Sequence, residues 1–112
     1  MRPLFYSFNP QTQEVTAHHD IESYAAVIVE QDDSERILAH TTINDSLIST
    51  VFLGIDYNCN GNIPLLFETM VFGGLLDGEQ QRYTTYEQAM LGHHEMMQKA
   101  LILLSVQEDT TP

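Results

Sequence analysis

The chain has 112 residues, and its 16 Asp and Glu against 4 Lys and Arg give a formal net charge of −12. This length suits one domain, and a hydrophobic content of 43% can form a buried core, which argues against intrinsic disorder. Four basic residues cannot neutralise a run of phosphates, so the composition argues against direct binding to DNA, RNA or an anionic membrane surface.

Cysteine content and targeting signals indicate the compartment. The single cysteine, Cys59, excludes an intrachain disulfide and fits a reducing environment. No apolar stretch approaches the roughly eighteen residues that a membrane-spanning helix requires. The N-terminus also lacks the apolar region of a signal peptide. We therefore expect a cytoplasmic protein, and no motif indicates a bound cofactor.

The N-terminal third predicts a short hairpin followed by a helix. Two short strands are expected at 4–8 and 13–16, separated by a polar turn. Asp20 can cap a helix over 21–30, in which apolar residues recur at steps of three and four. The run at 27–29 fits a strand as well as the end of this helix, so both alternatives stay open.

The middle of the chain predicts an antiparallel meander. Two β-rich runs, at 35–43 and 46–54, are joined by Asn44-Asp45, a pair that tolerates the left-handed conformations of tight hairpin turns. A third strand over 65–72 is mostly apolar on both faces, which is typical of a central strand. A short edge strand is expected at 80–83.

A long helix is expected from about Thr85 to about Leu104, with Thr84 as its N-cap and Glu87 as the reciprocal partner of a capping box. Gly92 in its middle costs about 1 kcal/mol relative to Ala, and close packing against the sheet would explain it. The apolar face of this helix is expected to comprise Tyr86, Ala89, Met90, His93, Met97, Ala100, Leu101 and Leu104.

Together these elements predict a single α+β domain over residues 1–106. Its core is a three- to four-stranded antiparallel meander. The long C-terminal helix and the shorter N-terminal helix pack on one face of that sheet. Residues 107–112 are polar and are expected to form a flexible tail.

An ordered series of segments supports a resemblance to known proteins. The chain contains STVFLGID at 49–56, PLLFETMVFGG at 64–74, LDGE at 76–79 and RYTTYEQA at 82–89. The series spans roughly residues 47–98 and resembles a widespread family of small, largely uncharacterised phage and prophage proteins. The departures from the family pattern are Tyr57 for His, Leu75 for Pro and Tyr86 for Trp.

The resemblance implies a phage or mobile-element origin but no particular chemistry. Small phage accessory proteins often antagonise host defences. The family therefore suggests a class of partner and assigns no catalytic residue.

Glu68 is a carboxylate inside the apolar third strand. A buried carboxylate needs a partner or a shifted pKa, and Arg36 and Arg82 are the candidate partners. A structural salt bridge is the simplest interpretation. The alternative is a ligand-binding or general-base carboxylate, with Asp56 as its companion.

Two histidine pairs invite a metal-binding hypothesis. In His93-His94, adjacent helical positions point about 100° apart, so the pair cannot easily chelate one ion. A packed His93 and an exposed His94 are expected instead. A zinc site assembled across loops from His18 and His19 stays open, although no metal is indicated by spacing.

The leading functional hypothesis is a non-enzymatic inhibitor of a host defence system, of the anti-CRISPR or another anti-defence type. Its acidic surface would occupy a basic, nucleic-acid-binding surface of a host protein in the cytoplasm of an infected or lysogenic bacterium. Acidity that only keeps a small protein soluble explains the charge nearly as well. The acids expected to be most available are Glu30, Asp32, Asp33, Glu35, Asp77, Glu79 and Glu95.

Three further hypotheses follow from other residues. A small-ligand binder could pair Arg36 and Arg82 with a nucleotide phosphate across an interface. A metal-dependent hydrolase could use histidines and acids from loops. Methionines on the long helix suggest self-association, so a homodimer is a further possibility.

Overall fold

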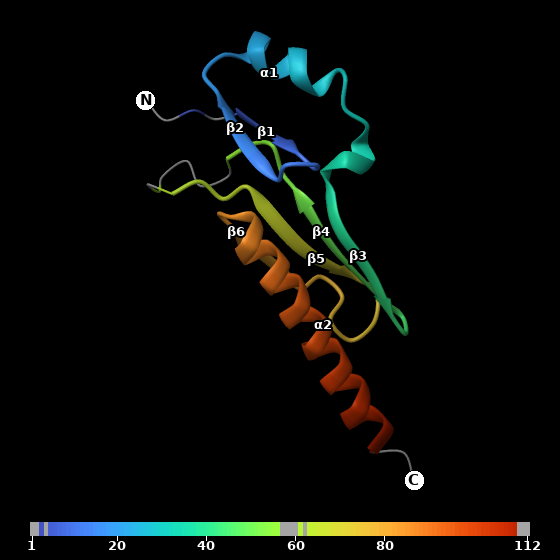
Figure 1. Ribbon diagram of the computed structural model, residues 1–112. Helices are drawn as coiled ribbons and strands as arrows, with labels where there is room; N and C mark the ends of the chain where they lie inside the picture. The colour runs from blue at the N-terminus through green and yellow to red at the C-terminus, as the bar shows by residue number, and fades with distance from the viewer. Residues whose placement is uncertain (1–2, 4, 57–60, 62, 110–112) are drawn as a thin grey trace.

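The computed structural model describes residues 3, 5–56, 61 and 63–109, with side chains up to residue 106. The described chain is α+β, with two antiparallel sheets and two α-helices (Figure 1). The elements in chain order are β1 (Phe5–Asn9), β2 (Glu14–His18), α1 (Ile21–Ile28), the 3₁₀ helix η1 (Asp33–Arg36), β3 (Ile37–Ile43), β4 (Ser46–Phe52), β5 (Phe67–Phe72), β6 (Gln80–Tyr83) and α2 (Tyr86–Asp109).

The N-terminal hairpin and first helix form close to the expected residues, but α1 packs mainly on this hairpin and not, as expected, on the larger sheet. Strands β1 and β2 pair antiparallel, with Phe5 opposite His18. The Asp20 carboxylate accepts a hydrogen bond from the Ser23 amide and caps α1. Because α1 continues to Ile28 and is followed by a turn, the strand alternative for residues 27–29 is wrong.

The larger sheet is an antiparallel meander in the order β3-β4-β5-β6. Asn44 has φ 52° in the two-residue turn between β3 and β4, the left-handed conformation that the Asn-Asp pair indicated. Strand β5 pairs with β4 on one side and with β6 on the other. Its prediction as a central strand is therefore confirmed.

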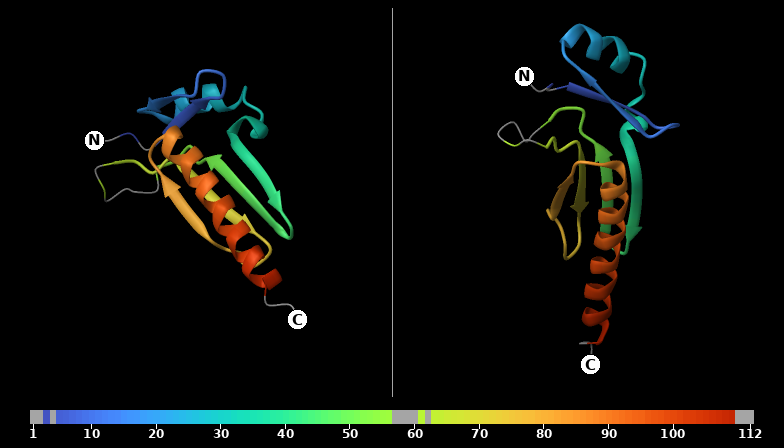
Figure 2. Two further views of the ribbon diagram at one scale, coloured as in Figure 1. Left: turned by 60° about the horizontal axis from the view of Figure 1, so that its bottom comes forward. Right: turned by 60° about the vertical axis from the view of Figure 1, so that its left-hand side comes forward.

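Helix α2 covers one face of this sheet, and the opposite face is more open (Figure 2). On β5 the buried residues are Phe67, Thr69 and Val71, which alternate with the partly exposed Glu68 and Met70. Phe72 at the strand end is 50% exposed. A strand that is apolar on both faces thus buries only one of them within the described chain.

The N-terminal hairpin packs against the end of β4. Tyr6 donates its amide to the Gly54 carbonyl at 2.8 Å, and Phe5 forms an isolated bridge with Ile55. Phe8 stacks on Phe52, with ring centroids 5.4 Å apart. These contacts join the two sheets through one hydrophobic core cluster, which also includes Tyr6, Leu66, Phe67 and Ala89.

The start of α2 differs from the expected one by a single residue. Helix α2 begins at Tyr86, so Thr85 rather than Thr84 is the N-cap. The Thr85 hydroxyl accepts from the Gln88 amide at 3.1 Å, and the Gln88 side-chain oxygen accepts from the amides of both threonines. The capping box is therefore Thr85 with Gln88, and the prediction of Thr84 with Glu87 is wrong.

The C-terminal end of α2 also differs. The helix runs to Asp109, three residues into the segment expected to be a tail, and residues 110–112 lie outside the described residues. Leu101, expected on the buried face, is 50% exposed, whereas Leu103 packs against the second core cluster. That cluster consists of Ile48, Val71, Leu76 and Ala100.

The molecule is elongated, with principal extents of 60 × 30 × 20 Å. Helix α2 has 24 residues, which gives a length of about 36 Å at 1.5 Å per residue. Strand β4 has seven residues and spans only about 23 Å. The last turns of α2 therefore extend past the end of the sheet (Figures 1 and 2). No helix in the described part of the chain is long and apolar enough to cross a bilayer.

Candidate functional site

The expected acidic residues fall into groups at opposite ends of the larger sheet. The first group lies between α1 and the start of β3, in and beside η1. The Asp32 carboxylate caps η1 by accepting from the Ser34 amide at 3.1 Å. The group comprises the exposed Glu30, Asp32 and Asp33 and the partly exposed Glu35.

The second group lies where the β5–β6 loop meets the β3–β4 turn. The pairing of Leu47 with Phe72 brings these two connections to the same sheet end, which is the end away from η1. Asp77 accepts from the Gly73 amide at 2.7 Å, and the Glu79 carboxylate pairs with Lys99 of α2. Glu95 is apart from both groups, exposed on α2 beside Tyr83.

The cations of the described chain are all bound to acceptors within the protein. Arg36 donates to the backbone carbonyls of Phe52 and Leu53, and Lys99 donates to Glu79. Arg82 donates to Glu68. The electrostatic character of the described surface therefore comes from acids with few neighbouring cations available to neutralise them.

Glu68 forms a cross-strand ion pair. Its Oε2 accepts from Nε of Arg82 at 3.0 Å, and the two residues face each other in the β5–β6 register. The Glu68 side chain is 15% exposed, so it is not fully buried. The structural salt bridge is confirmed, with Arg82 as the partner, and Arg36 is instead bound to backbone carbonyls.

Asp56 has a local structural role. It is 3% exposed and accepts from the Leu65 amide at 3.1 Å, which ties the two ends of the connection between β4 and β5. The contacts described for Glu68 and Asp56, with Arg82 and with the Leu65 amide, are thus structural. Cys59 lies outside the described residues.

His93 is the centre of a buried polar chain that reaches three strands. Its Nε2 is 2.9 Å from the Thr41 hydroxyl on β3, and its Nδ1 is 2.7 Å from the Thr50 hydroxyl on β4. Thr50 is in turn 2.6 Å from the Thr69 hydroxyl on β5. His93 is 4% exposed and His94 is exposed, so the expected packed and exposed pair is confirmed.

Burial lowers the pKa of His93, and the nearby His40 and His94 lower it further. Burial likewise raises the pKa of Tyr83, which Glu95 raises further and the Thr69 hydroxyl partly offsets. The Tyr83 hydroxyl oxygen is buried without a hydrogen bond of normal geometry. Both groups are therefore held neutral near pH 7, which suits a structural role.

No local sequence pattern indicated directly that His93 would bond to threonines on three strands. The feature that could have indicated a buried polar network is the placement of Thr41, Thr50 and Thr69 among apolar strand residues. Each of them lies on the face that α2 covers. Assigning them to one histidine required the register of three strands, which local patterns do not specify.

His18 is also a structural histidine. Its Nε2 is 2.7 Å from the Ser7 hydroxyl and its Nδ1 is 2.8 Å from the Ser23 hydroxyl. Both ring nitrogens are occupied, while His19 is exposed. Within the described residues, no three His, Cys, Asp or Glu side chains gather as a metal site requires. The structure therefore gives no support to the metal-dependent hydrolase.

Comparisons with protein-family models, curated proteins and solved structures found no match. The resemblance to phage proteins therefore stays a prediction from the sequence.

Proposed function

We propose that this protein is a non-enzymatic binding protein whose acidic surface occupies a basic, nucleic-acid-binding surface of another protein. The observation that most supports the proposal is that the basic side chains of the described residues are already bound within the protein. Arg36, Arg82 and Lys99 are each bound to an acceptor inside the protein. The excess of acids in the chain is therefore left to attract positive charge from outside.

The distribution of the acids favours an extended partner surface. They lie at both ends of the larger sheet in a molecule 60 Å long. Nucleic acids present phosphates in rows, and the proteins that bind them present rows of Lys and Arg. A long acidic body matches such a groove better than it matches a compact basic site.

The resemblance to phage proteins supports a narrower form of the proposal. In that form the partner is a component of a CRISPR system or of another defence system of the infected or lysogenic bacterium. The small-ligand alternative has less support, because the guanidinium groups of Arg36 and Arg82 are bound to protein acceptors.

The proposal is tested by capture followed by competition. The protein is immobilised, exposed to bacterial host lysate at low salt and eluted with a salt gradient. Eluted proteins are then assayed for DNA or RNA binding with and without added free protein. We expect a nucleic-acid-binding protein that elutes with moderate salt and loses its nucleic acid to the added protein.

Matched variants distinguish binding through a particular acidic surface from binding through the net charge of the protein. Glu30→Gln with Asp33→Asn and Glu14→Gln with Glu22→Gln remove the same charge from exposed positions in different segments. We expect the first pair to weaken capture more than the second. Equal losses would indicate net charge alone, and no salt-sensitive nucleic-acid-binding partner would refute the proposal.

A further inference from the structure

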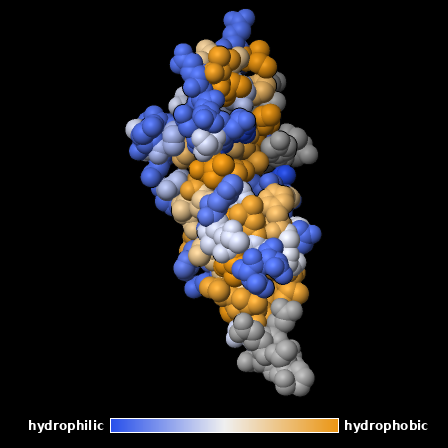
Figure 3. Space-filling view, turned by 90° about the vertical axis from the view of Figure 1, so that its right-hand side faces the viewer, coloured by the Kyte–Doolittle hydropathy of each residue, from blue (hydrophilic) through white to orange (hydrophobic). Residues whose placement is uncertain are grey.

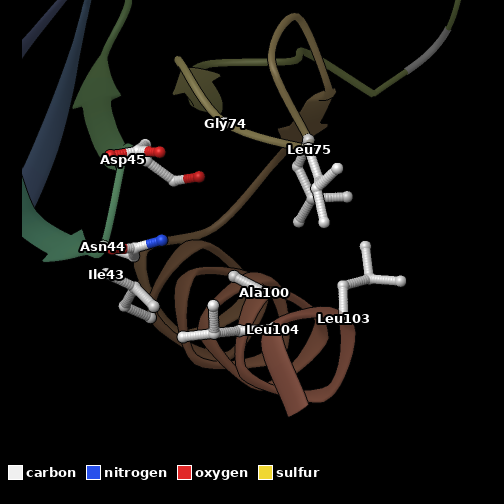
Figure 4. A pocket seen from close by; sticks show the side chains of 10 residues that line it. Ile43, Asn44, Asp45, Gly74, Leu75, Ala100, Leu103 and Leu104 are labelled. Carbon is white, nitrogen blue, oxygen red and sulfur yellow. The ribbon is translucent and has the colours of Figure 1, made fainter. Parts of the chain in front are cut away.

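A small pocket with both aliphatic and polar lining residues lies where α2 extends past the end of the sheet; its polar side includes Asn44, Asp45 and Ser46. It has a volume of about 150 Å³. Figure 4 shows side chains from β3, from the β5–β6 loop and from α2 around a common space. Its aliphatic lining consists of Ile43, Leu75, Leu76, Ala100, Leu103 and Leu104.

Further apolar side chains are exposed at this end of the molecule. Leu75, in the pocket lining, is 63% exposed. Leu101 and Ile102, which lie on other sides of α2 than its pocket-lining residues, are 50% and 63% exposed. Apolar residues gather at this end of the molecule, next to the grey C-terminal residues (Figure 3). Residues 100–106 include no charged side chain, although the chain has 16 acids. Such grouping of exposed aliphatic side chains is typical of a binding surface.

The margin of the pocket is negatively charged. Asp45 lines it, and Asp77 and Glu79 follow Leu76 in the adjoining loop. The nearby cation, Lys99, is paired with Glu79. A second copy of the chain would bring two acidic margins together, so charge disfavours self-association here. Charge complementarity instead favours an occupant with Lys or Arg beside an aliphatic side chain.

We propose that this pocket is the anchor site for a basic amphipathic segment of the partner protein. One aliphatic side chain of that segment fills the pocket, and neighbouring Lys or Arg residues face Asp45 and Asp77. Aliphatic anchors in small pockets commonly supply much of the affinity of an interface, while surrounding charges speed association. This inference rests on the proposed function and adds the place and chemistry of its main contact.

The test uses two synthetic helical peptides of equal charge. One is an amphipathic helix of Leu and Lys, and in the other every Leu is replaced by Gln. Affinities are measured by calorimetry, and the site is located by methyl NMR of the Leu and Ile residues. We expect the Leu peptide to bind about tenfold more tightly or better and to shift the signals of Leu75, Leu103 and Leu104.

Exposed variants complete the design. Leu75→Gln and Asp45→Asn change residues that are not buried, so the fold is expected to persist, as circular dichroism would verify. Each substitution should lower the affinity of the protein for the Leu peptide by about fivefold or more. Val29→Gln, at a residue that is 81% exposed on the N-terminal part, is the matched control and should change nothing.

The outcomes distinguish this inference from the proposed function. Equal binding of both peptides, unchanged by Leu75→Gln, would overturn the pocket as an anchor and leave attraction to basic surfaces intact. No binding of either peptide at low salt would count against the proposed function as well. A concentration-dependent dimer in sedimentation, abolished by Leu75→Gln, would make a second copy the occupant and would also overturn the inference.

Discussion

At the scale of single residues, the hydrogen bonds around His93 suit a neutral ring, in which one ring nitrogen donates and the other accepts. In one tautomer the hydrogens are placed as follows. Thr69 donates to Thr50, Thr50 donates to Nδ1 of His93, and the Nε2 hydrogen is donated to Thr41. In the other tautomer, Nδ1 donates to Thr50, Thr50 donates to Thr69, and Thr41 donates to Nε2. A protonated ring donates from both nitrogens, so in either case the threonine that donates to the ring would have to turn its hydrogen away. Protonation therefore adds a buried charge and also disturbs the chain.

This arrangement makes stability depend on pH. Because burial lowers the pKa of His93 in the folded protein, the unfolded chain is protonated first as the pH falls below 6.5. Unfolding free energy should therefore be highest above pH 6.5 and should decrease as the pH falls toward the folded-state pKa. The measurement is urea unfolding from pH 7.5 to 5.

The matched variants for this measurement are His93→Gln and His94→Gln. His93→Gln should cost about 1–3 kcal/mol at neutral pH, because it disrupts buried hydrogen bonds, and that cost should shrink in acid. His94→Gln, at an exposed position, should behave like the natural sequence. A cost for His93→Gln that does not vary with pH would contradict the assignment of His93 as the group that titrates.

Gly92 is explained by Tyr83. A Cβ atom at Gly92 would lie 2.1 Å from the Tyr83 hydroxyl oxygen and 2.2 Å from Cζ of the ring. Gly92→Ala should therefore destabilise the protein by about 1–3 kcal/mol through overpacking, although Ala favours helices. Thermal unfolding of Gly92→Ala alone and in a Tyr83→Ala background measures this. In that background Gly92→Ala should be neutral or stabilising, and an unchanged penalty would contradict the steric cause.

At the scale of elements, the capping of α2 gives a direct comparison between adjacent threonines. Thr85→Ala removes the hydroxyl that accepts from the Gln88 amide and should cost about 1 kcal/mol. Thr84→Ala leaves that bond in place and should cost clearly less. Chemical unfolding of both variants is the measurement, and a larger loss for Thr84→Ala would restore the capping box that the sequence suggested.

The same helix shows what local sequence can and cannot predict. Local patterns located the strands and both α-helices of the described residues, because alternation, helical steps and turn residues are properties of short segments. They missed η1, since Glu35 and Arg36 were expected in a strand and lie in this 3₁₀ helix. A second, overlapping capping box, Thr85 with Gln88, also fits the sequence, and it is the one that forms. Leu101 fitted the apolar stripe yet is 50% exposed, whereas the adjacent Ala100 is 7% exposed, because neighbouring helical residues point about 100° apart and only one side of α2 is covered here. The Arg82 partner of Glu68 followed from strand register, which spacing alone does not give.

At the scale of the whole molecule, the separation of the acids could not be predicted from their spacing. Glu35 and Asp45 are ten positions apart and lie at opposite ends of one hairpin strand. A net charge of −12 on this small body should also oppose compactness. The charge is therefore expected to matter for stability as well as for binding.

Added salt should stabilise the protein by screening this repulsion. Raising NaCl from about 0.05 to 0.5 M should increase the unfolding free energy by on the order of 1 kcal/mol. The less charged variant with Glu14→Gln and Glu22→Gln should gain less from the same change. Stability that falls with salt in the natural sequence would indicate that ion pairs outweigh repulsion.

The central claim is that acidic groups on this protein occupy a surface where nucleic acid otherwise binds. Its most direct test is the displacement of a labelled DNA or RNA duplex from a basic protein captured from host lysate. We expect stoichiometric displacement of the duplex at low salt. The apparent affinity of the protein in this competition should fall about tenfold or more near 0.3 M salt. The variant with Glu30→Gln and Asp33→Asn should also displace the duplex less well. Absence of displacement, or displacement unaffected by salt and by neutralised acids, would contradict the claim.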